Sequence, residues 1–351
     1  MMHAAKQLPT RDLQQAAELL QEHGLIDLHI DTLIPPRLWG SDPLQRHGLG
    51  VLGGRFFGHL DVPRLSDNRV HAAMWSITTN PFRTAAGRYR AWQQNLQRAQ
   101  QLIERSLGQL QVVRSPNDLE AAQRSGKHGV LLAVQGANAW DGAPDLDTVL
   151  ADGVVTRATL VHLTDSSLGA TSSPLSLRRN KDLRPRAAEV IAALNRHRAF
   201  VDLAHIHPTG FWQALALTDR DHPPIATHTG VTGVTPHWRN LDDQQIRAIA
   251  ERGGVVGVMA AGNFLARNGR TGDLGAYLAH LEHVLKVGGA QVAAIGTDLD
   301  GAIVPPAEMR NNIPYLTLVA AMLQAGWPRH QVAAVCSGNF LACWKRLRPD
   351  R

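Results

Sequence analysis

Short apolar runs recur along the chain and alternate with longer stretches whose apolar residues have helical spacing. Each run has the length of a strand, and runs that are apolar at nearly every position are typical of strands covered on both faces. The runs occupy residues 24–31, 70–78, 128–136, 156–163, 199–205, 223–229, 253–260 and 292–301.

Helical patterns lie between and around these runs. Those between the runs occupy residues 88–107, 185–197, 208–217, 241–251 and 274–287. Before the first run, Leu13, Ala16, Ala17 and Leu20 predict an amphipathic N-terminal helix within residues 1–23. After the last run, residues 305–351 are predicted to form a C-terminal helical extension, with the helical pattern over 314–347.

The alternation of strands and helices indicates an α/β fold with a parallel sheet. Eight strand candidates favour a closed (β/α)₈ TIM-like barrel over an open doubly wound sheet. No glycine-rich phosphate loop follows the first run, which argues against a nucleotide-binding open sheet. We therefore predict a single barrel domain over residues 1–351.

The apolar runs end in polar side chains of a narrow range of types. In a (β/α)₈ barrel the C-terminal strand ends surround one mouth, and active sites lie there. Four histidines and several carboxylates at one rim predict a shared site. The residues at these ends are His29, Asp31, Gln135, His162, His205, His228, Asp298 and Asp300.

The chemistry of these side chains suits a divalent ion. His29 and Asp31 are two positions apart and would face one site together, either as a hydrogen-bonded pair or as metal ligands. Neutral imidazole and carboxylate are ligands that zinc prefers. Two ions roughly 3.5–4 Å apart could share a hydroxide and polarise a carbonyl. A carboxylate after the eighth strand could then pass the proton to a leaving amine, which completes a scheme for amide hydrolysis.

Composition and charge exclude few classes of protein. No apolar stretch is long enough to span a bilayer, and the N-terminus has no signal-peptide core, so we expect a cytoplasmic enzyme with no membrane partner. The net charge is +6, but the one dense basic stretch, residues 176–186, has no interleaved aromatics. We therefore expect no nucleic-acid partner. Cys336 and Cys343 are two helical turns apart, too far for a disulfide, and we expect them to be buried packing residues.

The motifs around these residues resemble those of the membrane (renal) dipeptidase family, zinc-dependent enzymes of the amidohydrolase-like barrel superfamily. "DLHID" (27–31) resembles the family's first-strand metal motif, and "VDLAH" and "THTGV" resemble two strands that carry metal histidines. The segment 58–77 is similar to the family's approach to its second strand, and "SGNFLACWKR" is similar to its closing helix. The segment 236–258 and "IGTDLDG" match the stretches that supply an arginine and a catalytic aspartate.

The resemblance implies a role for each residue. His29 and Asp31 would bind one zinc ion, and His205 and His228 would bind the other. Asp298 would be catalytic, and His162 would contact the substrate carbonyl or the tetrahedral intermediate. Arg239 would pair with the free carboxylate of a dipeptide. The implied function is hydrolysis of a dipeptide or similar small substrate by a metal-bound hydroxide, in a chain that forms a homodimer as one option.

One position departs from the family. The family bridges its two metals with a glutamate at the end of the third strand, where this chain has Gln135. An amide offers one good acceptor where a carboxylate offers two, and it removes a negative charge worth about 4 kcal/mol to an ion roughly 4 Å away at an effective dielectric of about 20. The site could therefore hold two zinc ions, one, or none. The alternative function is a catalytically silent or repurposed barrel that binds a peptide-like metabolite.

Several other residues are expected to have structural roles. His207 is predicted to be a loop residue and Asp300 a loop-supporting residue after Asp298. Core packing explains Trp75, Trp140 and Trp212 as well as a pocket does. Substrate preference is expected to depend on loops 32–57, 137–150 and 164–184, where the family's asparagine after His162 is also missing.

Overall fold

The computed structural model describes residues 9–50, 52–266 and 272–349. In these residues nine parallel strands form one sheet, in the order β1-β2-β4-β5-β6-β7-β8-β9, with β3 paired to β4 outside this path. The strands are β1 Leu25–Ile30, β2 Val70–Thr78, β3 Leu110–Val112, β4 His128–Gln135, β5 Val155–Thr159, β6 Phe200–Asp202, β7 Ile225–Thr229, β8 Val255–Val258 and β9 Ala293–Ile295.

The sheet curls until its first and last strands meet. Ile30 and Leu299 form a parallel bridge, the Asp298 amide donates to the His29 carbonyl at 2.9 Å, and the Asp31 amide donates to the Leu299 carbonyl at 2.9 Å. The predicted (β/α)₈ TIM-like barrel is confirmed. Each of the eight predicted runs contains one barrel strand, whereas β3 was not predicted.

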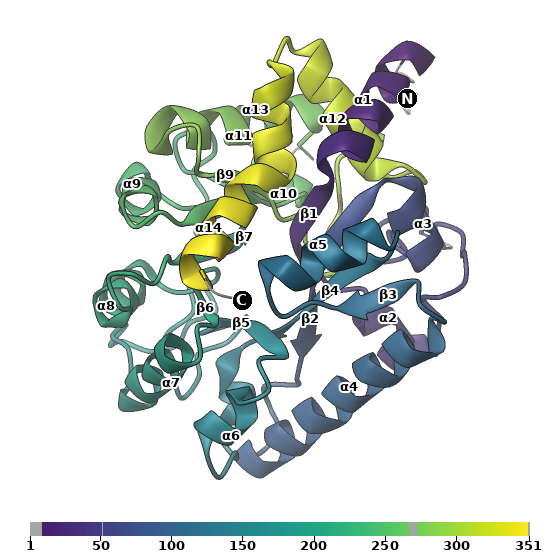
Figure 1. Cartoon of the computed structure of the whole chain (residues 1–351). Helices are drawn as coiled ribbons and strands as arrows, with labels where there is room; N and C mark the ends of the chain where they lie inside the picture. The colour runs from purple at the N-terminus through teal and green to yellow at the C-terminus, as the bar shows by residue number, and fades with distance from the viewer. Residues whose placement is uncertain (1–8, 51, 267–271, 350–351) are drawn as a thin grey trace.

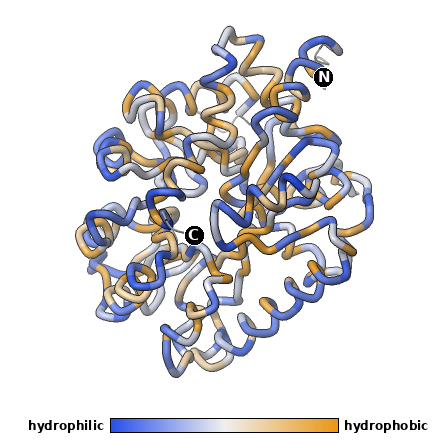
Figure 2. Tube along the Cα trace, viewed as in Figure 1, coloured by the Kyte–Doolittle hydropathy of each residue, from blue (hydrophilic) through white to orange (hydrophobic). Residues whose placement is uncertain are grey.

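Helices surround the ring of strands, and the outer faces of helices such as α4 are largely hydrophilic (Figures 1 and 2). Most lie where helical spacing predicts them, while α2, α3, α5, α6 and α10 are short and were not predicted. The helices before β8 are α1 Thr10–His23, α2 Ile34–Trp39, α3 Val62–Asp67, α4 Ala85–Arg105, α5 Pro116–Arg124, α6 Leu146–Leu150, α7 Pro185–Arg196, α8 Pro208–Leu217 and α9 Asp243–Glu251. Those after β8 are α10 Gly262–Leu265, α11 Leu274–Gly288, α12 Pro314–Gln324, α13 Arg329–Ala333 and α14 Asn339–Leu347.

The two ends of the chain pack together as helices. Helix α1 packs on α12, and the Ser337 hydroxyl donates to the carbonyl of His23 at 2.8 Å. The predicted N-terminal helix is present from Thr10, and residues 1–8 of that prediction lie outside the described residues. The C-terminal extension contains α12, which ends at Gln324, and, after a turn over 325–328, α13 and α14 joined by a π-helical turn at Ala334–Gly338.

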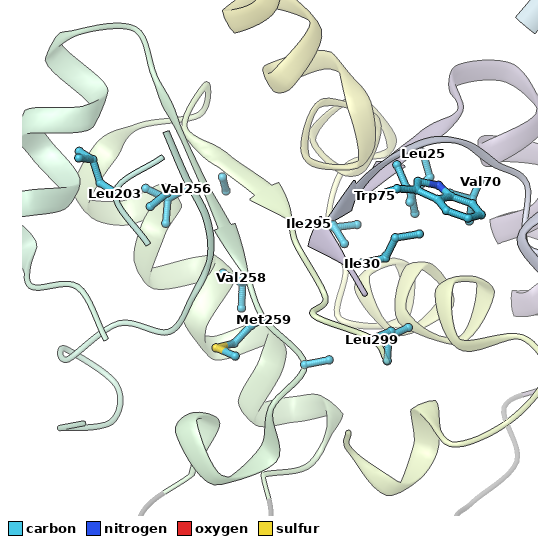
Figure 3. Close-up of a cluster of buried hydrophobic side chains, with 14 of the residues drawn as sticks. Leu25, Ile30, Val70, Trp75, Leu203, Val256, Val258, Met259, Ile295 and Leu299 are labelled. Atoms are coloured by element: carbon cyan, nitrogen blue, oxygen red, sulfur yellow. The ribbon is translucent and has the colours of Figure 1, made fainter. Parts of the chain in front are cut away.

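Two apolar cores hold the barrel. The larger core lies between the sheet and the helices and includes Leu25, Ile30, Val70 and Trp75, which gather on one side of Figure 3. The smaller core fills the barrel interior with residues of successive strands, such as Leu28, Met74 and Leu131. Phe340, Cys343 and Trp344 of α14 complete it, so this helix closes the barrel at the end away from the predicted site (Figure 1).

The fold bears on two predictions, one about the cysteines and one about membrane-spanning segments. Cys336 and Cys343 are buried and free, as expected for packing residues. Within the described residues no helix is both long and apolar enough to cross a membrane. The division into a single domain, the cytoplasmic location and the homodimer stay predictions.

Candidate functional site

The polar residues predicted at the strand ends meet at one mouth of the barrel. His29, Gln135 and His228 lie within β1, β4 and β7, and Asp31 directly follows β1. His162, His205 and Asp298 each lie three residues beyond the end of their strand. We use the term cup for the five residues at the centre of this group, which are His29, Asp31, His205, His228 and Asp298.

The cup is compact and buried. The Nε2 atoms of His205 and His228 lie 2.8 Å apart, and the rings of His29 and His228 have centroids 3.8 Å apart. His29 Nε2 is 3.7 Å from Asp31 Oδ2 and 3.6 Å from Asp298 Oδ1. The two residue pairs that the resemblance assigned to separate ions therefore lie in one cluster.

An irregularity in β1 turns His29 into the barrel. The pairing of β1 with β2 shifts register between Asp27 and Ile30. Leu28 packs inside the barrel, and its neighbour His29 also contacts interior groups, Ser76 of β2 and Arg157 of β5. A regular strand would send these two consecutive side chains to opposite faces. The local shift resolves that conflict, as β-bulges do beside active sites.

Asp27 positions two residues of the cup, His29 and Asp298. Its carboxylate accepts hydrogen bonds from the amides of His29 at 2.9 Å and Thr297 at 3.0 Å, and from the hydroxyls of Thr297 at 2.6 Å and Tyr315 at 2.7 Å. Burial raises the pKa of Asp27, although these bonds oppose the rise. Because Thr297 precedes Asp298, one carboxylate sets the relative positions of His29 and Asp298.

Asp202 fixes the other half in the same way. Its carboxylate accepts from the amides of Ala204 at 3.1 Å and Thr227 at 3.0 Å, and from the Thr227 hydroxyl at 2.7 Å. Thr227 precedes His228, and Ala204 precedes His205. We call these two arrangements, Asp27 with Thr297 and Asp202 with Thr227, the Asp–Thr brackets.

Arg157 links the second bracket to His29. Its fully buried guanidinium lies 3.2 Å from Asp202 Oδ2, donates to Ser76 Oγ at 2.8 Å and lies 3.0 Å from His29 Nδ1. Burial, and after it Arg157, lowers the pKa of His29 well below the ordinary value, so this imidazole is neutral. Sequence reasoning missed Arg157, Asp202 and Asp27, because a charged residue inside an apolar run gives no periodic signal.

The two acids of the cup, Asp31 and Asp298, have raised pKa values. Burial raises the pKa of Asp31 to about 6, even though His162 and the arginines near it oppose the rise. Burial, and then the charge of Asp31, raises the pKa of Asp298 well above its ordinary value. Burial also keeps the pKa of His205 and of His228 well below the usual range. The result is a group of neutral imidazoles around two acids that form no ion pair with a lysine or arginine within 4.0 Å among the described residues.

The donor atoms of the cup fit a divalent ion. His29 Nε2, Asp31 Oδ1 and Gln135 Oε1 are buried and have no hydrogen-bond partner among the described residues. Such orphaned atoms are rare unless something absent satisfies them. Ligand atoms of His29, His228 and Asp298 also lie within 4.8 Å of one another. Imidazole nitrogen and carboxylate oxygen are zinc ligands, so the residues present match a metal site.

Gln135 borders this group from β4. Its Nε2 lies 3.5 Å from His205 Nε2, and its side chain is buried. The amide therefore occupies the edge of the cup where the resemblance expects a bridging carboxylate. The structure contains no carboxylate from the β4 end that could replace it, since Asp141 pairs with Arg88 and Asp145 caps α6.

Arg239 and His162 stand beside the cup. Arg239 is buried and donates from Nη2 to the His228 carbonyl at 2.6 Å, while its Nε has no partner in the described part of the chain. Burial lowers the pKa of Arg239 to about 10 against the opposing effect of Asp298, so it stays cationic. His162 meets His205 edge to face, with ring centroids 4.9 Å apart, and burial lowers its pKa to about 4.

A cavity of about 630 Å³ opens onto the cup, and a second of about 470 Å³ adjoins it at Gln135 and His162. The larger cavity is also lined by Arg55 and Phe56 of the expected loop 32–57 and by residues that sequence reasoning did not single out, which are Trp238, Asn263 and Phe264 of α10, Ile303 and Arg310. Of the three loops expected to set specificity, 32–57 lines the larger cavity directly. Loops 137–150 and 164–184 reach only the smaller one, through Asn138 and Thr164.

The residues expected to be structural are placed accordingly. Asp300 accepts hydrogen bonds from the His59 amide at 2.8 Å and the Thr32 hydroxyl at 3.3 Å. His207 caps the N-terminus of α8 by accepting from the Thr209 amide at 3.2 Å. Trp75 and Trp140 lie in the larger core, and Trp212 is 40% exposed and lines neither cavity at the cup.

A parallel eight-stranded barrel with histidines and acids gathered at its C-terminal strand ends defines the class of barrels whose sites hold divalent ions. Within that class, the chain belongs to the membrane dipeptidase family, Peptidase family M19, whose model matches residues 13–349. The resemblance seen in the motifs is thereby confirmed, and the chain is an enzyme of the metallo-dipeptidase kind.

Individual relatives agree with this assignment. The chain is similar to an uncharacterized protein in the pqqA 5′ region of Klebsiella pneumoniae, at 30% identity over 220 residues, which cover 61% of this chain and 80% of that protein. It is 25% identical over 347 residues to an uncharacterized dipeptidase of Schizosaccharomyces pombe, covering 95% and 83% of the two chains. A metallopeptidase from Rhodobacter sphaeroides, solved with a phosphinate mimic of the dipeptide L-Ala-D-Ala, shares the fold, with a TM-score of 0.80 at 23% identity over 92% of this chain and 98% of that one.

Proposed function

We propose that this protein hydrolyses the amide bond of a dipeptide, or of a similar small substrate with a free carboxylate, in a metal-dependent reaction. The observation that carries the proposal is the cup itself. Residues from β1, β7 and the segments after β6 and β9 converge there, and three buried polar atoms around it have no hydrogen-bond partner within the described ranges. The family to which the chain belongs supports the same reaction class.

His29, Asp31, His205 and His228 would hold the ion or ions, with Gln135 offering its Oε1. A bound divalent ion supplies a water that is acidic enough to attack at neutral pH, and it polarises the scissile carbonyl. The Asp–Thr brackets position these ligands before any ion binds, because they fix the backbone at both halves of the cup.

The remaining residues would bind the substrate and move the proton. Arg239 lines the cavity, its Nε has no hydrogen-bond partner among the described residues, and its guanidinium would bind the free carboxylate of the substrate. His162 is neutral at pH 7 and would donate a hydrogen bond to the carbonyl oxygen as negative charge develops on it. Asp298 would take the proton of the attacking water at a carboxylate oxygen and deliver it to the leaving amine.

A second function is favoured by one specific observation, the amide at position 135. Gln135 supplies no negative charge, and the guanidinium of Arg157 lies 3.0 Å from His29 on the far side of the imidazole. Both features weaken the hold on a doubly charged ion. The alternative is a mononuclear or metal-poor barrel that binds or modifies a peptide-like metabolite without dipeptide hydrolysis.

Metal content and turnover separate the two functions. Protein purified with added zinc is analysed by mass spectrometry for ions per chain and is assayed against L-Ala-L-Ala and L-Ala-D-Ala. One or two zinc ions per chain together with hydrolysis of either dipeptide support the proposal. Absence of both zinc and turnover rejects it and leaves the binding function. The cytoplasmic location and the absence of nucleic-acid and membrane partners stay predictions.

A further inference from the structure

Two arginines besides Arg239 line the cavity above the cup. Arg55 comes from the segment after α2 and is exposed, whereas Arg310 follows a 3₁₀ turn at Ala307–Met309 and is half-buried. Neither was assigned a role by the sequence motifs. They lie far apart in the chain, so their presence on one cavity is a product of the fold.

The loop that carries Arg55 is fastened to the segment that follows Asp298. The amide of Phe56 donates to the Ile303 carbonyl at 2.8 Å in an antiparallel bridge. His59 Nε2 bonds the Gly54 carbonyl at 2.8 Å, and the His59 amide donates to Asp300 at 2.8 Å. The two arginines are therefore held in fixed relation to the proposed catalytic aspartate.

Gly54 brings the two arginines together. It adopts a φ of +71°, which favours glycine, and a Cβ added there would lie 3.6 Å from Arg310 Cβ. The stem of Arg310 thus packs beside the residue that precedes Arg55. The two charges are close enough that Arg55, after burial, lowers the pKa of Arg310.

The described residues supply no ion-pair partner within 4.0 Å for these two arginines. Neither guanidinium takes part in an ion pair within 4.0 Å among residues 9–50, 52–266 and 272–349, and Arg310 Nε is buried without a hydrogen-bond partner. Glu308, two residues from Arg310, forms no ion pair with it within 4.0 Å, although its negative charge opposes the lowering of the Arg310 pKa. The carboxylates that line the cavity are Asp31 and Asp298, and both belong to the cup.

We propose that Arg55 and Arg310 bind a second anionic group of the substrate, so that the preferred dipeptide carries an aspartate or glutamate side chain in addition to its terminal carboxylate. The inference rests on the proposed function, in which Arg239 takes the terminal carboxylate. Guanidinium groups recognise carboxylates through paired hydrogen bonds, and two neighbouring guanidiniums on one cavity wall create a positive potential that attracts an anion.

The test compares acidic dipeptides with their neutral amide counterparts. Ala-Glu is paired with Ala-Gln and Glu-Ala with Gln-Ala, each in the L,L and L,D forms. Since a hydrogen bond to a charged group contributes about 1.5–3 kcal/mol, the wild-type enzyme should prefer the acidic member of at least one pair by about tenfold or more in kcat/KM. Arg55→Gln and Arg310→Gln should each reduce this preference, because kcat/KM for the acidic substrate should fall by a larger factor than kcat/KM for its amide.

Arg90→Gln is the matched control, because Arg90 is exposed on α4 and lines neither cavity at the cup. This variant should keep the wild-type preference. Equal turnover of acidic and amide dipeptides by the wild-type enzyme overturns the inference, and so does an equal loss for both substrates in the two cavity variants.

Turnover of the neutral dipeptides reports separately on the proposed function. If they are hydrolysed without any preference for acid, only this inference fails. If no dipeptide is hydrolysed, calorimetric titration of the same peptides decides it. Tighter binding of Ala-Glu or Glu-Ala than of its amide, lost in Arg310→Gln but kept in Arg90→Gln, upholds the inference, and equal binding rejects it.

Discussion

Gln135 ends β4 with its amide 3.5 Å from the ring of His205, and its oxygen is buried without a partner. Its position at the edge of the cup was predictable, because it ends an apolar run at the same rim as the histidines. Its electrical effect follows from one atom, since an amide nitrogen stands where a carboxylate would have a second oxygen. The resemblance expects a carboxylate at this position, so a substitution that restores one tests the effect of the exchange.

Gln135→Glu should therefore raise the affinity for metal. The new carboxylate adds one negative charge next to ions held mainly by neutral imidazoles, a favourable change of about 1–4 kcal/mol at roughly 4 Å. We expect more zinc per chain at limiting free zinc and faster dipeptide hydrolysis. Mass spectrometry of the dialysed protein measures the first effect. An unchanged zinc content at every free zinc concentration would show that this side chain does not contact the ions.

Other residues of the site could not be predicted from the sequence. His29, His162, His205 and His228 were found because each stands at the end of an apolar run. Arg157 stands inside one, and only the structure shows that its charge is balanced by Asp202 at 3.2 Å. Arg55 and Arg310 lie in loops without periodicity, so no pattern connects them with the cavity.

At the scale of elements, the Asp–Thr brackets connect pairs of strands at the level of the cup. Asp27 joins β1 to the turn after β9, and Asp202 joins β6 to β7. The two brackets differ in one respect that matters for stability. Burial raises the pKa of Asp27, whereas for Asp202 the effect of burial is outweighed by Arg157 and by hydroxyl bonds, which leave its pKa below the ordinary value.

Asp202→Asn should consequently destabilise the fold more than Asp27→Asn. The first change leaves the buried guanidinium of Arg157 without its carboxylate, at a cost of about 3–5 kcal/mol. The second change weakens only hydrogen bonds from uncharged donors, at a cost of about 1–3 kcal/mol of folding stability. Urea denaturation of both variants in the presence of a chelator, which removes any contribution from metal, gives the comparison. Equal unfolding midpoints would contradict the role assigned to Arg157.

The opposite end of β4 provides a pH-dependent prediction that does not involve the cup. His128 is buried, accepts a hydrogen bond from Trp75 Nε1 at 3.1 Å and bonds the Val70 carbonyl through Nδ1 at 2.8 Å. Burial lowers its pKa to about 4. The folded chain therefore binds this proton less tightly than the unfolded chain, whose histidine has a pKa of about 6.5.

The contribution of His128 to stability should be complete above pH 6.5 and decline as the pH falls to about 4, by up to about 3 kcal/mol. His128→Gln should be less stable at pH 7.5 but lose less stability on acidification. Denaturation curves between pH 7.5 and 4.5 measure the difference, which corresponds to about one proton taken up on unfolding. Parallel pH profiles of the two proteins would contradict the prediction.

Most elements were predictable because the periodicity of apolar residues reports which faces are buried. The eight barrel strands and the long helices have strong patterns, and their positions were predicted within a few residues. Strand β3 was not predicted because its residues, Leu110–Val112, are only partly buried and do not form an apolar run, and α10 has four residues, too few to display a period. The register shift in β1 could not be predicted either. All six residues of this strand are buried, so burial does not alternate along it.

At the scale of the whole molecule, the two ends of the barrel have different roles, one in stability and the other in the candidate chemistry. One end is closed by α14, whose Phe340 and Trp344 pack onto the interior residues of the strands. The other end carries the cup, the cavity and the acids whose pKa values burial raises. Apolar burial at the closed end stabilises the fold. The buried acidic groups at the open end destabilise it in part, because they are positioned to bind an ion.

The central claim is that the cup binds metal. Crystals grown with zinc and measured at the zinc absorption edge test it directly, because anomalous scattering locates the ion without reference to activity. We predict a peak within coordination distance, about 2.0–2.1 Å for a zinc–nitrogen bond, of the ring nitrogens of His205 and His228. Crystals that contain zinc elsewhere but show no anomalous peak among His29, Asp31, His205 and His228 would contradict the account.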